Sequence, residues 1–282
     1  MKQDCIRIQK MAHQLRRDVL NMGVRSGNKC HIGPSFSCAE IISALYFSFL
    51  DIKPDQPHWE DRDRFIISKG HAALIVYAAL AHRGYFDSSE LWNVKNTGSM
   101  LQGHPDMNKT PGIDMTSGSL GHGLSLGFGI AWGLRRQKKE SKVVVLLGDG
   151  DSQEGLVWEA AMSIPAKKLN NVIAVLDYNH MQSSGSVDTI LPMEPLVDKW
   201  KAFGWHVLEV AGHDVCQILE ALNAAAHHDQ RPSIIIAHTI KGKGVSFMEH
   251  NNAWHACHIT EEEYRLAMEE IEIAENKLIE MI

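Results

Sequence analysis

The sequence predicts an α/β protein with a doubly wound, mostly parallel sheet and helices on both faces. The first observation is that short apolar segments alternate with longer amphipathic segments through the second half of the chain. Such alternation favours parallel strands joined by helices that cover both faces of the sheet. The second observation is the length of 282 residues, which is enough to bury a real core. The expected strands are 142–147, 171–177, 205–210 and 233–238, and the expected helices are 153–164, 195–203 and 214–228.

The first half of the chain is expected to be mainly helical. Apolar residues recur at helical spacing over residues 5–24, from Ile8 to Met22. The mostly apolar stretch from Ser37 to Leu50 predicts one buried helix. The remaining elements expected here are a strand at 65–68, a helix over 72–82 that Gly70-His71 opens, and a short helix that starts at 88–91.

A long loop and a glycine-bearing helix join the two halves. Residues 96–123 are rich in Gly, Pro, Thr and Asn and predict a loop, and a helix is expected over 124–136. Gly127, Gly129 and Gly133 lie in that helix, where glycine lowers helix stability. We therefore expect the helix to pack closely against another element and to be buried against other chains.

The end of the chain predicts a capped helix. Thr260 and Glu263 have the spacing of a capping box, which opens an acidic C-terminal helix. No repeat, low-complexity tract or long linker divides the sequence. We expect a single domain over residues 1–282, with an N-terminal helical segment and a C-terminal helix.

Composition argues against several classes of partner. The net charge of −6 and the lack of a basic stripe argue against nucleic acid. The N-terminus lacks the apolar region of a signal peptide, and no apolar stretch is long enough to span a membrane. The five cysteines are scattered and form no CxxC pair, so we expect reduced thiols in a cytoplasmic protein.

The strongest motif lies at the ends of two expected strands. Gly148-Asp149-Gly150 follows the apolar run 143–147, and Asn179 follows the next strand. Neighbouring parallel strands would place a carboxylate and an amide oxygen together, and these are ligands suited to Mg²⁺ or Ca²⁺ carrying a diphosphate. Glycine lets the backbone approach the phosphates. The pattern resembles the GDG…N signature of thiamine-diphosphate enzymes.

Four histidines lie in turns or at helix starts, next to glycine or other small residues. A single histidine in such a place is more often a structural hydrogen-bonding group than a catalyst. Four of them beside a cofactor motif favour a catalytic role, because imidazole transfers protons near neutral pH. The four are His31, His71, His104 and His255.

Two glycine-rich segments have alternative interpretations. Residues 116–125 contain part of a dinucleotide-binding pattern, but no suitable strand precedes them and no ribose-binding acid follows. Lys241-Gly242-Lys243-Gly244 lacks the spacing of a phosphate loop, and a solvated basic turn near the mouth of the site is at least as plausible.

Eight motifs together resemble the amino-terminal half of a transketolase, as found where the enzyme is split into two polypeptides. They occur in the family's order and cover nearly the whole chain. The resemblance implies a thiamine-diphosphate-binding fold, specifically its diphosphate-binding domain. The motifs are SGNKCHIGPSFS, SKGHAALIVYAAL, QGHPD, GIDMTSGSLGHGLS, LLGDGDSQEG, LDYNH, TIKGKG and AWHA.

The resemblance implies a metal site of three ligands. Asp149, Asn179 and the backbone carbonyl of Met181 would hold Mg²⁺, or Ca²⁺ or Mn²⁺ in its place. Glu154 would belong to the groups that orient this site. Glu159 would lie at a subunit interface, where acidic side chains link two cofactors.

The same resemblance implies contacts to thiamine diphosphate. Gly150, His71 and His255 would contact the diphosphate, and Asn179 would bind it through the metal. Gly118 and Leu120 would lie against the aminopyrimidine side of the cofactor.

By resemblance the reaction is transfer of a two-carbon ketol unit from a ketose phosphate to an aldose phosphate. His255 would remove the proton of the donor's C3 hydroxyl, while His31 and His104 would bind the two-carbon fragment. The cofactor-activating glutamate and the arginines that bind the sugar phosphate belong to a pyrimidine-binding domain, which we expect on a partner subunit. Two copies of each chain, an α2β2 heterotetramer, are the expected particle.

Other functions stay open at this point. The chain could be a cofactor-binding or assembly module without turnover. It could also resemble the α subunit of a 2-oxoacid dehydrogenase or a 1-deoxyxylulose-phosphate synthase. The dehydrogenase subunit shares GDG…N but is not expected to carry the four histidines.

Overall fold

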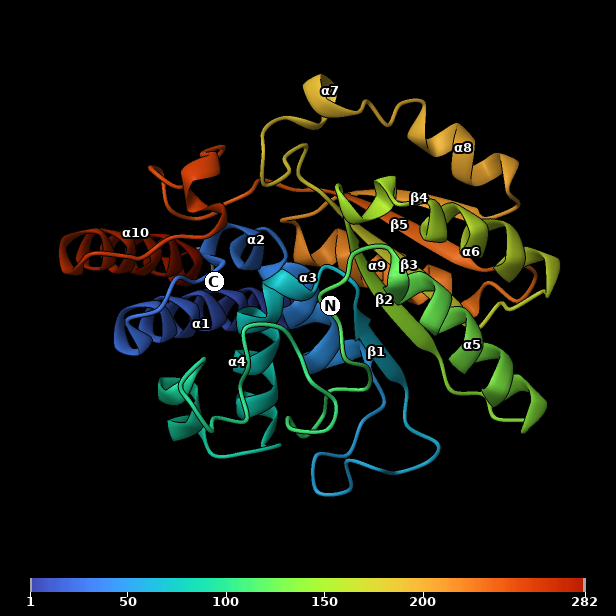
Figure 1. The fold of residues 1–282 in the computed structure, drawn as a ribbon, viewed down its shortest axis with the longest axis horizontal. Helices are drawn as coiled ribbons and strands as arrows, with labels where there is room; N and C mark the ends of the chain where they lie inside the picture. The colour runs from blue at the N-terminus through green and yellow to red at the C-terminus, as the bar shows by residue number, and fades with distance from the viewer. Residues whose placement is uncertain (1, 281–282) are drawn as a thin grey trace.

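The protein is built on a five-stranded parallel sheet, seen in a computed structural model that describes residues 2–280 (Figure 1). The strand order is β1-β2-β3-β5-β4, and every neighbouring pair is parallel. This confirms the predicted sheet and places the two strands of the GDG…N motif side by side. The strands are β1 (Arg64–Ile67), β2 (Val143–Gly148), β3 (Val172–Tyr178), β4 (His206–Ala211) and β5 (Ser233–His238).

Alternate residues of each strand face opposite layers of helices. In β2, Val144 and Leu146 pack with one hydrophobic cluster, whereas Val143, Val145 and Leu147 pack with the other. The sheet is therefore buried on both faces, as apolar parallel strands require. One layer holds α1 (Lys2–Ser26), α3 (Ala39–Ala44), α4 (Ala73–Arg83) and α9 (Val215–His227), and the other holds α5 (His122–Arg136), α6 (Gly155–Ala166) and α8 (Leu196–Ala202).

The single helix expected from Ser37 to Leu50 is wrong. The chain instead forms α2 (Ile32–Ser37), α3 and a π-helical turn η1 (Leu45–Phe49). The break falls at Cys38, where the Ser37 hydroxyl contacts the carboxylate of Asp177 at 2.5 Å. The break therefore lies next to a contact with a distant strand, which the continuous apolar pattern of the segment does not reveal.

The other short elements follow the sequence closely. Glu263 N–H donates to the Thr260 hydroxyl, and Thr260 N–H donates to the Glu263 carboxylate, so the predicted capping box is confirmed at the start of α10 (Glu261–Glu280). Pro165 lies within α6, which ends at Ala166, two residues beyond the predicted end at 164. The remaining elements are η2 (Gly70–Ala72), η3 (Ser88–Asn93), η4 (Asp151–Gln153), α7 (Val187–Ile190) and η5 (Asn252–His255).

The glycines of α5 fall into two environments. A Cβ on Gly127 would lie 2.7 Å from Val145 of β2, so this glycine allows the helix to approach the sheet. A Cβ on Gly129 or Gly133 would meet no other group of the described chain within 4 Å. Trp132, which lies beside Gly133 in the sequence, is 40 % exposed. The expected close packing is thus present at Gly127, while burial of the outer side against other chains stays a prediction.

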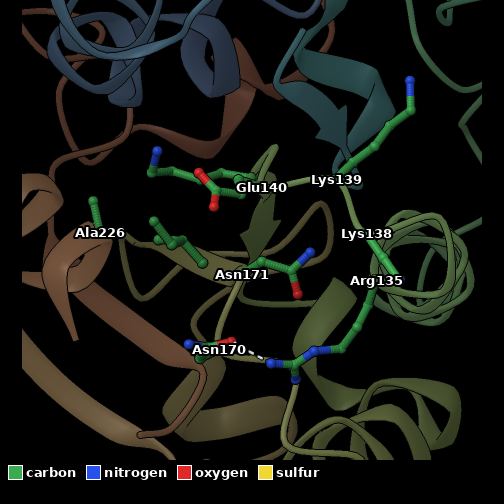
Figure 2. A pocket seen from close by; sticks show the side chains of 9 residues that line it. Arg135, Lys138, Lys139, Glu140, Asn170, Asn171 and Ala226 are labelled. Carbon is green, nitrogen blue, oxygen red and sulfur yellow. Dashed lines mark hydrogen bonds between the residues drawn. The ribbon is translucent and has the colours of Figure 1, made fainter. Parts of the chain in front are cut away.

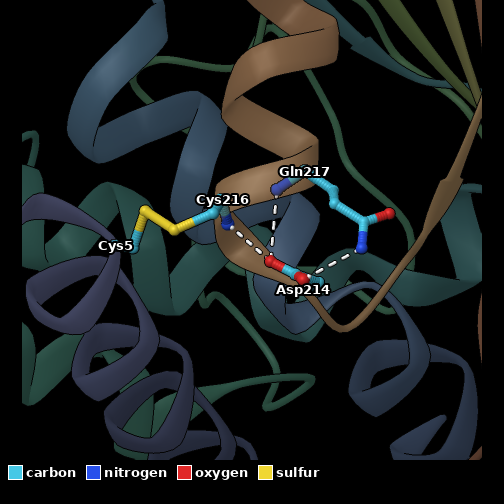
Figure 3. The surroundings of a disulfide bond; sticks show 4 residues. All are labelled: Cys5, Asp214, Cys216 and Gln217. Carbon is cyan, nitrogen blue, oxygen red and sulfur yellow. Dashed lines mark hydrogen bonds between the residues drawn. A yellow bond between two sulfur atoms is a disulfide. The ribbon is translucent and has the colours of Figure 1, made fainter. Parts of the chain in front are cut away.

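The expectation that all cysteines are reduced is wrong for one pair. Cys5 of α1 and Cys216 of α9 form a disulfide, shown in Figure 3 beside the Asp214 cap of α9. The two residues are 211 positions apart, and only the packing of α1 against α9 brings them together. Cys30, Cys38 and Cys257 are free thiols.

No helix in the described part of the chain is long and apolar enough to cross a membrane. The cytoplasmic location stays a prediction.

Candidate active site at the carboxyl end of the sheet

Asp149 and Asn179 meet at the carboxyl ends of β2 and β3. The Asp149 carboxylate accepts hydrogen bonds from the backbone N–H groups of Asn179 and His180, each at 3.1 Å. The Asn179 side-chain oxygen accepts one from the Met181 N–H at 3.1 Å. Burial, followed by the nearby Asp177 carboxylate, raises the pKa of Asp149 to about 7. A buried carboxylate with a raised pKa is a group that a bound cation would stabilise in its charged form.

These oxygens open into a cavity of about 370 Å³. It lies where parallel α/β sheets bind their ligands, beyond the carboxyl ends of the strands. Eight of the predicted site residues line it: His71, Leu120, Asp149, Gly150, Glu154, Asn179, Met181 and His255. Glu154 is exposed at the rim.

The three predicted site residues outside that lining, Gly118, His31 and His104, lie next to it. Gly118 has a φ of 137° and faces His104, so that a Cβ on Gly118 would lie 3.1 Å from the imidazole. A Cβ on Gly70 would lie 2.8 Å from the Gly118 nitrogen. The two glycines therefore let the Gly118 segment pack closely between the Gly70 turn and His104.

The four histidines form one cluster, although they come from four separate segments. The ring centres of His71 and His255 are 5.2 Å apart, and His31 lies 5.5 Å from His255. His31 is also 5.6 Å from His71 and 6.0 Å from His104. The sequence spacing alone could not place these rings together.

Burial shifts all four histidines of the cluster toward the neutral form by lowering the pKa of each. Burial, followed by the charge of Lys95, lowers the pKa of His31 to about 4, and burial with Lys241 lowers that of His255 to about 3. The same effect of burial lowers the pKa of His71 well below its usual range and also lowers that of His104. Neutral imidazoles can accept protons and hydrogen bonds.

Asp177 and Lys69 form a buried ion pair that the sequence analysis missed. The Lys69 ammonium group donates to the Asp177 carboxylate and, at 3.0 Å, to the carbonyl of Pro34. Asp177 also accepts bonds from the hydroxyls of Ser37 and Thr239. The available signal was a single carboxylate at the end of an otherwise apolar strand. This network ties the Asn179 strand end to three other segments.

Lys241 is buried, so the expectation of a solvated basic turn is wrong at this position. Its ammonium group donates to the Gln182 carbonyl at 3.0 Å and to Asn252 at 2.6 Å. Gly242 has a φ of 81°, and a Cβ there would collide with Met248. This glycine turn directs Lys241 inward, where burial lowers its pKa to about 8.

Asp151 is a second buried carboxylate in the cavity lining. It accepts a hydrogen bond from the Gly121 N–H, and burial raises its pKa. It therefore holds the loop before α5 against the GDG turn.

Among the described residues no strand lies between η3 and α5, in agreement with the rejected dinucleotide interpretation.

A larger cavity, of about 520 Å³, lies at the opposite end of the sheet (Figure 2). Lys142 and Asn171 line it at the starts of β2 and β3. Arg135 donates to Asn170 there at 3.2 Å. It holds none of the predicted site residues, so we do not assign the chemistry to it.

These features define a thiamine-diphosphate-binding domain, and the family comparisons agree. Residues 8–279 match the family model described as transketolase, thiamine diphosphate binding domain. The chain belongs to the transketolase family. The predicted resemblance is thereby confirmed.

Two relatives cover nearly the same length as this chain. It is 42 % identical over 272 residues to the 6-deoxy-6-sulfo-D-fructose transketolase subunit SqwG of Clostridium sp. strain MSTE9, with 96 % of this chain and 98 % of that protein covered. It is 39 % identical over 241 residues to an apulose-4-phosphate transketolase subunit of Phocaeicola vulgatus, with 86 % and 85 % covered.

Solved transketolases share the fold. The structure superposes on transketolase from Leishmania mexicana with a TM-score of 0.85 at 26 % identity, covering 97 % of this chain and 45 % of that one. For the Campylobacter jejuni enzyme the TM-score is 0.84 at 27 % identity, covering 97 % and 48 %. This chain therefore spans about half of those solved chains.

Proposed function

We propose that this protein is the amino-terminal subunit of a two-subunit transketolase, which moves a two-carbon ketol unit from a ketose to an aldose. The observation that carries the proposal is the cluster of four neutral histidines beside the Asp149 and Asn179 cavity. A 2-oxoacid dehydrogenase or a 1-deoxyxylulose-phosphate synthase would need the same cofactor, but its donor is not a ketol. The histidine cluster is suited to sugar hydroxyls and favours the transketolase.

The cavity fits thiamine diphosphate and a divalent cation. Asp149, Asn179 and the Met181 carbonyl would bind the cation, for which Mg²⁺ is our first choice. The described residues contain no group of three or more His, Cys, Asp or Glu side chains able to hold a metal alone. The diphosphate would therefore complete the coordination. Buried Asp149, with its raised pKa, is the observation in favour of this fit.

The family resemblance, together with residues at or beside the cavity, supports the contacts proposed for the rest of the cofactor. Gly150, His71 and His255 would contact the diphosphate, and Gly118 and Leu120 would lie against the aminopyrimidine side. Glu154 at the rim would help to orient the metal site. Lys69 and Lys241 add positive charge next to the expected phosphates.

The histidines would manage the protons of the sugar. Thiamine diphosphate, when bound, supplies the carbon nucleophile that cleaves the donor. His255 would accept the proton of the C3 hydroxyl as the C2–C3 bond breaks, because its ring borders the cavity and imidazole can exchange protons there. His31 and His104 would bind the hydroxyl groups of the two-carbon fragment.

A second polypeptide would supply the rest of the active site. The names of the two relatives call each a transketolase subunit, and the solved transketolase chains are about twice as long. Trp132 of α5 and Met162 of α6 are exposed apolar residues, and exposed Glu159 lies in α6 with Met162. We propose that this surface is covered in an α2β2 heterotetramer, with residues 1–282 as one domain.

The donor would be a ketose with an anionic tail. The relatives are named for a sulfonated sugar and for a phosphorylated one, and both anions are compatible with a tail held by the partner. A panel of phosphorylated, sulfonated and uncharged ketoses separates these possibilities.

The co-purified complex of this chain and its partner tests the function directly. We expect ketol transfer by the complex with thiamine diphosphate and Mg²⁺, and none by either chain alone. A complex that binds the cofactor but transfers no ketol unit would instead support an assembly module. Turnover of 2-oxo acids in preference to ketoses would favour the dehydrogenase alternative.

A further inference from the structure

Two free cysteines are paired across the backbone next to the histidine cluster. Cys30 N–H donates to the Cys257 carbonyl at 2.8 Å, and Cys257 N–H donates to the Cys30 carbonyl at 3.1 Å. The two residues thus form an isolated antiparallel bridge. His31 follows Cys30 directly, and His255 lies two residues before Cys257. Any change in the spacing of the bridge therefore acts on both histidine segments.

The geometry of this bridge suits a disulfide. In a hydrogen-bonded antiparallel pair the Cα atoms lie roughly 5.5 Å apart, within the range of about 4.4–6.8 Å that disulfides span. Cys30 is fully buried, whereas Cys257 is half-buried and can be reached from solvent. A reagent would therefore meet Cys257 first and leave Cys30 as the thiol that closes the bond.

We propose that Cys30 and Cys257 are a redox-active pair, and that their oxidation by a small-molecule disulfide fixes the spacing of His31 and His255 and lowers turnover. The expected loss of turnover rests on the proposed function. The pairing of Cys30 with Cys257 rests only on the backbone bridge between them.

The oxidation is a balanced thiol–disulfide exchange. The Cys257 thiolate attacks the small disulfide, forming a mixed disulfide and releasing one small thiol. The Cys30 sulfur then attacks the Cys257 sulfur, which forms the protein disulfide and releases the second small thiol. The two thiol protons leave on the two released thiols. Burial raises the pKa of Cys257 to about 12, so the first step should be slow at neutral pH and faster at higher pH.

The bond should disturb the histidines because it is shorter than the bridge. Directly opposite Cβ atoms in such a pair lie up to about 5.5 Å apart, but a disulfide holds them at about 3.8 Å. Closing this difference moves the two cysteine side chains and fixes the bridge that joins the two histidine segments, whose His31 and His255 rings are 5.5 Å apart. A displacement of about 1 Å in a catalytic site can lower the rate on the order of 10²-fold.

The test uses the full chain in complex with its partner, treated with bis(2-hydroxyethyl) disulfide at about pH 9, where more of the thiol is ionised. The background is Cys5→Ala/Cys216→Ala, which removes the existing disulfide as a source of exchange. We expect a peptide cross-link between Cys30 and Cys257, with the loss of two hydrogens. We also expect a fall in ketol transfer of roughly 10²-fold, reversed by dithiothreitol.

The variants Cys257→Ala and Cys30→Ser should keep their rates under the same treatment. Cys257→Ala is sufficient if the buried Cys30 variant does not fold. Absence of the cross-link overturns the pairing. A cross-link without loss of rate, or an equal loss in Cys257→Ala, overturns the regulatory role. A complex inactive before treatment counts against the proposed function, while the cross-link measurement still decides the pairing.

Discussion

The cavities at the two ends of the sheet differ in how their charged groups are held. At the carboxyl end, Asp149, Lys69 and Lys241 are each at most 2 % exposed. At the amino end, the larger cavity is lined by basic side chains at the surface, and Lys139 pairs there with exposed Glu60. Cavity volume alone would place the active site at the amino end of the sheet. Burial of charge, which requires a compensating partner, selects the carboxyl end.

The largest effect is expected from removal of the buried carboxylate. Asp149→Ala should abolish metal-dependent binding of thiamine diphosphate by the complex, because it removes the charged oxygen ligand. Lys142→Met, in the amino-end cavity, is the matched control and should leave binding unchanged. Calorimetric titration with thiamine diphosphate, with and without Mg²⁺, measures cofactor binding by both variants. Wild-type affinity in Asp149→Ala would remove the basis for choosing the carboxyl end.

A histidine at each end gives the second comparison. His255→Ala should lower kcat by roughly 10²–10⁴, the usual range for loss of a general acid or base. His206 at the start of β4 stacks on His228 at 4.1 Å, and His206→Ala should leave kcat unchanged. Steady-state measurements of kcat at saturating cofactor test both variants. An unaltered rate in His255→Ala would make this histidine structural.

The ion pairs of the two ends should differ in stability. Lys69→Met leaves Asp177 buried without its counter-charge and should lower the free energy of unfolding by about 3–5 kcal/mol. Lys139→Met removes a pair with an exposed partner and should not shift the urea midpoint measurably. Equal urea midpoints for Lys69→Met and Lys139→Met would show that the buried ion pair contributes no more to stability than the exposed one.

The last prediction concerns pH dependence. The raised pKa of Asp149, about 7, means that the folded protein holds this proton more tightly than the unfolded chain does. Its contribution to stability is therefore lost as pH rises from about 4 to about 7 in the metal-free protein. Metal binding needs the carboxylate, so cation affinity should rise about tenfold per pH unit below 7 and then level off. Titration of Mg²⁺ affinity checks this, and a flat profile contradicts it.

Local patterns predicted much of the fold and the polar site. The apolar strands and the Thr260 capping box follow from spacing of a few residues, and the neighbouring positions of Asp149 and Asn179 follow from each one ending a strand of a parallel sheet. The histidines were selected by their turns and by family resemblance, but their mutual distances were not predictable. Four segments far apart in the sequence must pack before those rings meet.

The errors have the same physical origin. Apolar periodicity suggested one helix over 37–50, but the helix breaks at Cys38, beside the contact between Ser37 and Asp177. Scattered cysteines suggested free thiols, but the packing of α1 on α9 joins Cys5 to Cys216. In both cases a distant contact outweighed the local signal.

The sequence alone was thus sufficient for most strand and helix types, for the GDG…N motif and for the family, because each is a pattern of residue types along the chain. The tertiary structure was needed to show that Lys69 pairs with Asp177, that Lys241 is buried and that Cys30 faces Cys257. Those properties depend on how far each group is removed from water and on which distant group meets it there. The spacing of residues in the sequence reveals neither the burial of a group nor its distant partner.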